Sequence, residues 1–230
     1  MKIKNRPHVI INAAMTADGK TDTIARRGAA ISSSQDMARV DQMRAASDAI
    51  MVGGRTLLDE DPRLTIKSAE LRAERRARGL SENPIKVGVV TRAELKLDSR
   101  FLSYGPARIL IFTTNQTAST QIEKLRERGV EVIVFDEPHV NLQSTMEFLA
   151  HNGVAQLMVE GGGTLNAELL RLKLVDEIYL YVAPLILGGS TAPTFVDGDG
   201  WMRDQAIPLR LTDIKQDTVG GVLLHYDVQY

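Results

Sequence analysis

The stretch Leu157-Met-Val-Glu-Gly-Gly-Gly-Thr-Leu-Asn166 predicts a buried strand that ends at Glu160, a turn of three glycines, and a helix that Thr164 opens. Glycine lets a backbone approach a ligand closely and adopt positive φ, and the first turn of a helix presents N–H groups with no partner inside the helix. Such a turn is typical of a phosphate cradle. Glycine-rich turns also form without any ligand, so the triplet Gly161, Gly162 and Gly163 leaves both interpretations open.

Glu160 stands directly before this predicted cradle. A carboxylate that pointed into an anion site would repel a phosphate. We therefore expect its side chain to point sideways, towards a second ligand that needs an acid or an acceptor.

Composition favours an ordinary α/β protein. The chain has 230 residues, of which 43% are hydrophobic. That length suffices for one large domain or two small ones, and because no linker is visible we expect a single domain over residues 1–230. A net charge of −1 argues against binding to nucleic acid or to an acidic membrane.

Several classes of site are excluded by residue type. The chain has no cysteine, which excludes disulfides, thiolate catalysis and Cys-ligated zinc. Its four histidines are scattered, so we expect no metal. No apolar run approaches the roughly 18 residues of a membrane span, so a cytoplasmic protein is expected.

Alternating strands and helices predict a largely parallel sheet covered by helices. The expected strands are residues 9–15, 48–52, 85–90, 108–112, 130–135 and 177–183, and the expected helices are residues 35–46, 118–128, 141–152 and 165–172. Residues 68–79 are expected to form a charged surface helix, and residues 209–214 and 221–228 an antiparallel hairpin. The predicted fold class is therefore α/β with a mixed, mostly parallel sheet.

A second glycine turn, Gly53-Gly54, follows the strand predicted at residues 48–52. Ligands of parallel sheets bind at the carboxyl ends of the strands, so two glycine turns at such ends predict one shared site. The glycine patterns of phosphate loops and of ordinary dinucleotide-binding folds are absent. Such a site suits chemistry carried by an organic cofactor that the protein orients.

Six stretches resemble, in the same order, the riboflavin-biosynthesis pyrimidine reductases. They are Met15-Thr-Ala-Asp-Gly-Lys20, residues 44–56, Asp61-Pro-Arg-Leu-Thr65, Glu160-Gly-Gly-Gly-Thr-Leu165, Leu174-Val-Asp-Glu177 and residues 183–193. The stand-alone archaeal-type branch is the most similar, because of Ala192-Pro-Thr-Phe-Val-Asp-Gly-Asp-Gly200. The His-x-Glu and Pro-Cys-x-x-Cys motifs of the fused zinc deaminase are absent.

This resemblance implies a dihydrofolate-reductase-like fold and a homodimer. It also implies reduction of the ribosyl group of 2,5-diamino-6-ribosylamino-4(3H)-pyrimidinone 5′-phosphate to ribityl, with NADPH as the cofactor and NADH as the alternative. Hydride would pass to C1′ of the sugar after ring opening to an imine. An acid near the exocyclic nitrogen would make that imine a better acceptor, which gives Glu160 a role.

The resemblance also implies particular site residues. Glu160 and Asn12 would be catalytic. The implied cofactor contacts are Ala14, Thr56, Glu60, Arg92, Gly161, Gly162, Gly163 and Thr164, and the implied substrate contacts are Arg44, Leu64, Lys67 and Glu160. Arg44 and Lys67 are cations suited to the 5′-phosphate. Asn12 matches the archaeal-type pattern, where bacterial relatives tend to carry Lys.

Two positions depart from the family pattern. Glu60 stands where Asp is common, which moves the carboxylate by one methylene. Arg92 lies in Thr91-Arg-Ala93, where relatives often have Val-Asp-Ser. Arg92 is a candidate for the 2′-phosphate of NADPH, and equally for a solvent-facing arginine.

Three alternatives stay open at this point. The first is a reductase of the same fold that acts on the deaminated pyrimidine, and the second is one that acts on a pterin or folate. A folate enzyme would need a buried acid on the first helix, where Asp36 and Asp41 do not fall clearly on the apolar face. The third is a non-catalytic nucleotide-binding protein. For the dimer interface, the strand at residues 178–182 and the C-terminal hairpin are candidates.

Overall fold

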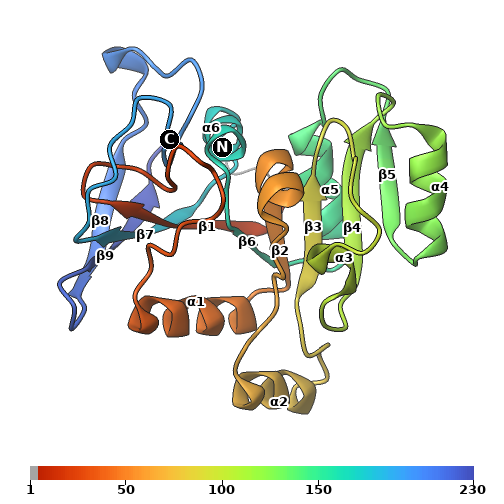
Figure 1. Ribbon diagram of the computed structural model, residues 1–230, viewed down its shortest axis with the longest axis horizontal. Helices are drawn as coiled ribbons and strands as arrows, with labels where there is room; N and C mark the ends of the chain where they lie inside the picture. Colours follow the sequence, from red (N-terminus) through yellow and green to blue (C-terminus); the bar gives the residue numbers. More distant parts are fainter. Residues whose placement is uncertain (1–4) are drawn as a thin grey trace. The chain divides into compact units, whose positions relative to one another are not determined.

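The computed structural model describes residues 5–230, which divide into two compact units (Figure 1). The first unit contains Asp41–Met158 and the described residues before His8. The second contains His8–Val40 and Val159–Tyr230. The prediction of a single domain stays a prediction.

The first unit is built on parallel strands. They are β2 (Ala49–Gly53), β3 (Ile85–Val89), β4 (Ile109–Thr114), β5 (Glu131–Phe135) and β6 (Gln156–Val159), in the order β5-β4-β3-β2-β6. The pairs β2–β3, β3–β4 and β4–β5 are parallel. Its helices are α2 (Ala69–Ala77), α3 (Arg100–Ser103), α4 (Ser119–Glu127) and α5 (Leu142–His151), and a π-helical turn covers Thr56–Glu60.

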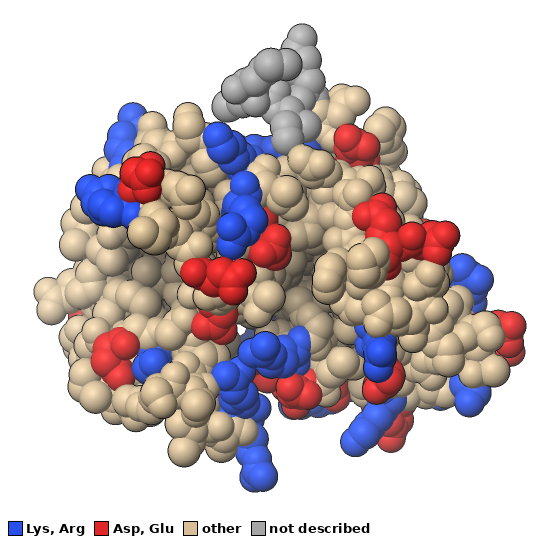
Figure 2. All heavy atoms as spheres, turned by 90° about the horizontal axis from the view of Figure 1, so that it is seen from above, with Lys and Arg blue, Asp and Glu red and all other residues tan. Residues whose placement is uncertain are grey.

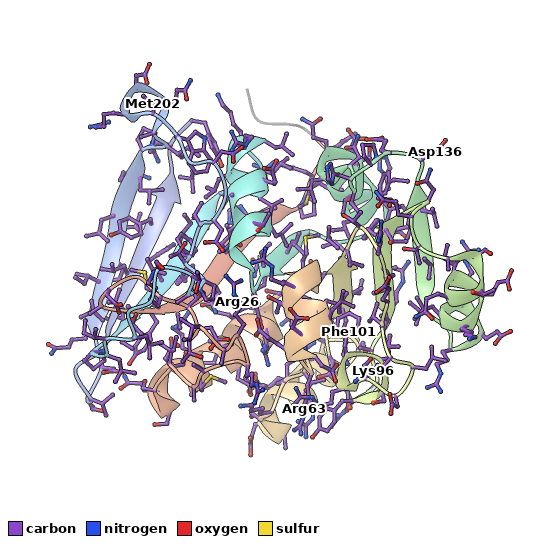
Figure 3. The ribbon with its side chains drawn as sticks, turned by 45° about the horizontal axis from the view of Figure 1, so that its top comes forward. Arg26, Arg63, Lys96, Phe101, Asp136 and Met202 are labelled. Atoms are coloured by element: carbon purple, nitrogen blue, oxygen red, sulfur yellow. The ribbon has the colours of Figure 1, made fainter. Side chains whose placement is uncertain are left out.

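The core of this unit explains why β2 is apolar without alternation. All five residues of β2 are buried, as expected for a strand of a parallel sheet that is covered on both faces. Phe101 of α3, labelled in Figure 3, packs in the same cluster as Ile50 and Leu64. The segment before α2 is therefore anchored in the core through Leu64.

The second unit carries the antiparallel part of the sheet. Its strands are β1 (His8–Thr16), β7 (Glu177–Ala183), β8 (Leu209–Gln216) and β9 (Val222–Val228), in the order β1-β7-β9-β8. β1 and β7 are parallel, whereas β7–β9 and β8–β9 are antiparallel. Helix α6 (Gly163–Arg171) and a short 3-10 turn (Arg203–Gln205) belong to this unit, and α1 (Ser34–Ala46) crosses the boundary at Val40. The predicted mixed, mostly parallel sheet with a C-terminal antiparallel hairpin is confirmed.

Three details differ from the sequence prediction. Helix α6 begins at Gly163 rather than Leu165, because Gly162 takes the extended N-cap position while the low helix propensity of glycine conceals the start. The four-residue helix α3 was not predicted. Helix α2 is not wholly solvated: Arg75 is 4% exposed and donates to the carbonyl oxygens of Ala45 and Ser47.

A buried lysine, Lys86 on β3, holds the C-terminal end of α3. Its side chain is fully buried, and Nζ donates to the carbonyl oxygens of Phe101 (2.9 Å) and Tyr104 (2.7 Å). Asp61 holds the other end, since its carboxylate accepts the backbone N–H groups of Arg100 (2.8 Å) and Phe101 (2.9 Å). Burial lowers the pKa of Lys86 from 10.5 to about 8, and the Asp61 carboxylate partly opposes that shift.

This depressed pKa predicts how stability depends on pH. Folded Lys86 releases its proton near pH 8, whereas unfolded Lys86 keeps it until about pH 10.5. Between about pH 8 and pH 10.5 the unfolded state binds more protons, so the contribution of Lys86 to the free energy of unfolding rises with pH. Below about pH 8 both states carry the proton, and this gain in stability is absent. Urea unfolding of the wild type and of Lys86→Met, at about pH 7 and about pH 9.5, measures this difference. An identical pH dependence in both proteins would contradict it.

Candidate functional site

The residues that the sequence predicts for the site fall into two groups, one in each unit. The second unit holds Asn12, Ala14, Glu160, Gly161, Gly162, Gly163 and Thr164. The first unit holds Arg44, Thr56, Glu60, Leu64, Lys67 and Arg92. Each group has its own geometry.

The triple glycine in the second unit forms a tight entry into α6. Gly161 has a φ of 93°, the peptide bond from Gly161 to Gly162 is cis, and Gly162 is the N-cap. A Cβ atom on Gly163 would lie 2.6 Å from the carbonyl oxygen of Thr194 and 2.8 Å from Cγ of Asp197. Gly163 is therefore required by its neighbours, which is a structural reason independent of any ligand.

The N-terminus of α6 keeps donors for an anion. Gly162 has no side chain to cap the helix, and among residues 5–230 no side chain accepts from the first-turn N–H groups. Thr164 is exposed in this first turn. The carboxylate of Asp197 occupies the Gly163 side of the terminus, so an anion has to approach from another side. This terminus fits a phosphate through N–H groups and the helix dipole.

Glu160 and Asn12 occupy different places along their strands, the first after the end of β6 and the second in the middle of β1. Glu160 directly follows the last residue of β6 and is half-buried. Asn12 lies in β1 with 8% exposure, and its Oδ1 accepts from Nη2 of Arg39 at 2.7 Å. Ala14 is two residues further along β1 and packs against Tyr181. Asn12 and Ala14 therefore share one face of β1.

Asp18 joins two of the sequence motifs in the second unit. Its carboxylate accepts from Oγ1 of Thr16 (2.6 Å) and from the backbone N–H groups of Gly188 (2.7 Å) and Leu187 (3.2 Å). These hydrogen bonds, led by that from Thr16, lower the pKa of Asp18 to about 2. The aspartate of the Met15–Lys20 motif therefore fixes the loop after β7 through hydrogen bonds to its backbone.

In the first unit, Arg44 of α1 contacts the segment that carries Leu64 and Lys67. Nη1 of Arg44 donates to the carbonyl oxygen of Thr65 at 2.8 Å. Leu64 is 1% exposed and has a φ of 48°. Lys67 is exposed at its side chain, while its backbone N–H donates to Asp41 at 2.7 Å. Arg44 of α1 and Asp41 thus hold the backbone of the segment on which Lys67 is exposed.

The two acids of α1 correct the sequence interpretation. Asp36 and Asp41 are 4% and 6% exposed, so both lie on the buried face of the helix. Asp41 accepts two backbone N–H groups at the start of α2, those of Lys67 and Ser68, and Asp36 is paired with Arg39. Asp41 therefore has a protein donor on each oxygen and Asp36 has Arg39 on Oδ1, which disfavours Asp41 above all as a pterin-binding acid.

Thr56 and Glu60 delimit the π-helical turn after β2. Thr56 is buried, whereas the side chain of Glu60 lies at the exposed end of the turn. Nη2 of Arg100 donates to the carbonyl oxygen of Glu60 at 2.7 Å. The backbone of Glu60 is thus fixed by α3, the helix that Lys86 and Asp61 hold at its two ends.

The side chain of Arg92 is exposed, and a hydrogen bond holds its Nε atom. Its Nε donates to Oε1 of Gln116 at 3.3 Å, and Nε2 of Gln116 donates to the carbonyl oxygen of Pro138 at 2.9 Å. The preceding carbonyl, that of Thr91, accepts from Oγ1 of Thr114 at 2.9 Å. The sequence analysis did not single out Gln116 and Thr114, although the run of hydroxyl and amide side chains from Thr113 to Thr117, at the end of β4, was the available signal.

The surface shows no dominance of one charge on the face in view: Figure 2 shows basic and acidic side chains interspersed there. None of the helices built from residues 5–230 is long and apolar enough to cross a membrane. In the same part of the chain, no group of three or more His, Asp or Glu residues is arranged to hold a metal ion.

Comparison with known proteins gives consistent results. The family model described as the RibD C-terminal domain matches residues 7–223. The chain is 42% identical, over 198 residues, to the 2,5-diamino-6-ribosylamino-4(3H)-pyrimidinone 5′-phosphate reductase of Archaeoglobus fulgidus, covering 86% of this chain and 90% of that protein. It is 37% identical to the protein of the same name from Methanothermobacter thermautotrophicus, covering 97% of this chain and 99% of the relative.

Solved structures agree on the fold. A pyrimidine reductase-like protein from Corynebacterium diphtheriae matches with a TM-score of 0.83 at 23% identity, over 98% of this chain and 93% of that one. At this identity the match concerns the fold alone.

Proposed function

Because the chain belongs to the family of the RibD C-terminal domain, we propose that it is an oxidoreductase of riboflavin biosynthesis. Its proposed substrate is 2,5-diamino-6-ribosylamino-4(3H)-pyrimidinone 5′-phosphate, the compound in the names of the relatives from Archaeoglobus fulgidus and Methanothermobacter thermautotrophicus. The reaction reduces the ribosyl group to ribityl, and we expect it to take place in the cytoplasm.

The observation that carries this proposal is the arrangement after β6. A half-buried carboxylate, Glu160, is followed within three residues by a helix N-terminus that no side chain of residues 5–230 caps. Hydride transfer from a phosphorylated cofactor to a substrate needs two kinds of group. One group transfers a proton to the substrate, and the other binds a phosphate of the cofactor.

Different residues of the chain are proposed to bind the cofactor, transfer the proton and bind the substrate. Bound NADPH supplies the hydride, and the N–H groups at the start of α6 hold one of its phosphates. Glu160 places a proton at the exocyclic nitrogen of the ring-opened sugar, which raises the electrophilicity of C1′. Arg44 and Lys67 hold the 5′-phosphate of the substrate through a planar fork and a point charge.

Preference for NADPH over NADH is proposed to depend on Arg92. Its Nε is committed to Gln116, so the two terminal nitrogens are the ones left to meet a 2′-phosphate. We expect Arg92→Leu to raise the KM for NADPH roughly tenfold while leaving the KM for NADH unchanged, because only NADPH carries that phosphate. Initial rates with each cofactor measure this. A parallel change for both cofactors would assign Arg92 to another task, and the exposed Arg128→Leu serves as the control for lost charge.

A homodimer is also part of the proposal. β8 is the last strand in the order, and all eight of its residues are exposed. Among them Leu211 and Ile214 are 49% and 59% exposed. An apolar edge strand of this kind is normally covered, because it otherwise pairs with other chains. β7, the other candidate, has Ile178 and Tyr181 buried at 1% and 2% exposure and offers less surface. Sedimentation equilibrium tests this, and a monomer at micromolar concentration would contradict it.

The test of the function is an assay of NADPH consumption with purified protein. The diamino and the deaminated ribosylaminopyrimidine phosphates are supplied separately. Faster turnover of the diamino compound is expected. Preference for the deaminated compound would transfer the chain to the alternative substrate, and no turnover with either compound would contradict the proposed reaction.

A further inference from the structure

Arg39 of α1 holds the side chain of Asn12 in one orientation. Its Nη2 lies 2.7 Å from Oδ1 of Asn12 and 2.7 Å from Oδ1 of Asp36, and its Nε lies 2.9 Å from the same Asp36 oxygen. A guanidinium only donates hydrogen bonds, so the atom of the Asn12 amide that faces it has to be the oxygen. The NH2 group of Asn12 is therefore turned away from Arg39.

The Asp36–Arg39 pair is removed from water. The side chains are 2% and 18% exposed, and Oδ2 of Asp36 has no hydrogen-bond partner among the described residues. Burying such a pair costs more desolvation energy than an apolar pair of similar size, so the pair is a weak contributor to stability. Its contact with Asn12 points to another task.

Aromatic packing fixes the guanidinium from a further side. Arg39 lies over the ring of Tyr179, with 5.9 Å from its Cζ to the ring centroid. Tyr179 is stacked on His225 at 4.0 Å between ring centroids, and Nε2 of His225 lies 2.8 Å from Glu177. Tyr179 is also the residue of β7 directly opposite Asn12 on β1. Arg39 is thus held by a carboxylate and by a stacked ring pair.

We propose that Asp36 and Arg39 are positioning residues, which turn the NH2 group of Asn12 towards the ligand so that Asn12 acts as a hydrogen-bond donor. Its partner is then a hydrogen-bond acceptor, such as a hydroxyl oxygen of the opened sugar. This inference rests on the proposed function for the placement of the ligand, but the orientation of Asn12 is a property of the chain alone.

The donor role is tested by two substitutions of Asn12. Asn12→Asp keeps an oxygen for Arg39 but removes the NH2 group, whereas Asn12→Leu removes both. If Asn12 is a donor, the two variants lose kcat to a similar extent, about tenfold or more. An Asn12→Asp protein that keeps the wild-type kcat would overturn the proposal.

The positioning role is tested by removing the pair as a whole. The double variant Asp36→Leu with Arg39→Met leaves no buried charge behind, so its thermal midpoint is expected to stay the same or rise. We expect kcat to fall about tenfold while the dissociation constant for NADPH changes less than about twofold. The control is Glu131→Leu with Arg108→Met, which removes an exposed pair in the other unit. A double variant with wild-type kcat would contradict the proposal.

A second readout separates this inference from the proposed function. The side-chain amide signals of Asn12 in a nitrogen-proton correlation spectrum report its hydrogen bond to Arg39 without any turnover. They are expected to shift in the double variant and to stay unchanged in the control. Shifted signals with an inactive wild type would overturn the reaction and leave the orientation of Asn12 standing, whereas unshifted signals would overturn the orientation.

Discussion

Glu160→Gln is expected to lower kcat by about a hundredfold or more, with little change in the KM for NADPH. Glutamine keeps the size of the side chain and still forms hydrogen bonds, but its amide cannot transfer a proton to the exocyclic nitrogen. Glu160 is half-buried at the end of β6, so the substitution does not alter the core. Steady-state kinetics with the diamino substrate measure the effect.

The matched control for Glu160 is Glu168→Gln. Glu168 is exposed on α6 and lies 3.5 Å from Arg171 in an exposed ion pair. The substitution Glu168→Gln removes one negative charge, as Glu160→Gln does. Exposed ion pairs of this kind contribute little to stability. An unchanged kcat in Glu160→Gln would contradict the proposed role of Glu160 as the acid.

Arg44→Met is expected to lower kcat/KM by roughly 10 to 100-fold, mainly through a higher KM. The guanidinium is held on the carbonyl oxygen of Thr65 at 2.8 Å, two residues before Lys67. Because a planar fork suits a phosphate, losing it removes charge-assisted hydrogen bonds that are present throughout the reaction. Initial rates over a range of substrate concentrations separate KM from kcat.

Arg72→Met controls for damage to the segment that carries Lys67. Nη1 of Arg72 donates to the carbonyl oxygens of Ile66 (2.7 Å) and Lys67 (2.8 Å), so the variant loosens the same backbone without removing a proposed phosphate ligand. A larger rise of KM in Arg72→Met than in Arg44→Met would indicate that the order of the segment, and not the cation, is what matters.

The strand pattern was predictable because it depends on local sequence. Continuous apolar runs such as that of β2 read directly as strands of a parallel sheet, and the hairpin of β8 and β9 followed from alternation. The turn after β6 was predictable for a similar reason, since a glycine triplet between a strand and a helix has few other uses. These features need no knowledge of distant contacts.

The partners of buried polar groups were not predictable. Asp36 and Asp41 interrupt an apolar helical pattern, and only the folded chain brings Arg39 and the N-terminus of α2 to them. Lys86 lies within an apolar strand and is fully buried, with two carbonyl oxygens at the end of α3 accepting from its ammonium group. A charge can be buried only where distant parts of the chain supply hydrogen-bond partners, and the hydrophobic periodicity of a sequence does not reveal these partners.

The site itself was predictable in part. The resemblance supplied Arg44, Leu64 and Lys67, whose role in binding stays a prediction, and in the structure Arg44 of α1 donates to Thr65 on the segment that carries the other two. It did not supply Gln116 or Arg39, because each acts on another side chain and carries no motif of its own. For Gly163 the structure adds a reason that the sequence lacked, namely the close approach of Thr194 and Asp197.

The most direct test of the proposed reaction is transfer of deuterium from NADPH that carries deuterium at both hydrogen positions of nicotinamide C4. The purified chain is incubated with the diamino ribosylaminopyrimidine phosphate, and the product is analysed by mass spectrometry and proton resonance. The account predicts one deuterium at C1′ of a ribityl product. Deuterium elsewhere in the product, or oxidation of NADPH without its incorporation, would contradict hydride transfer to the sugar.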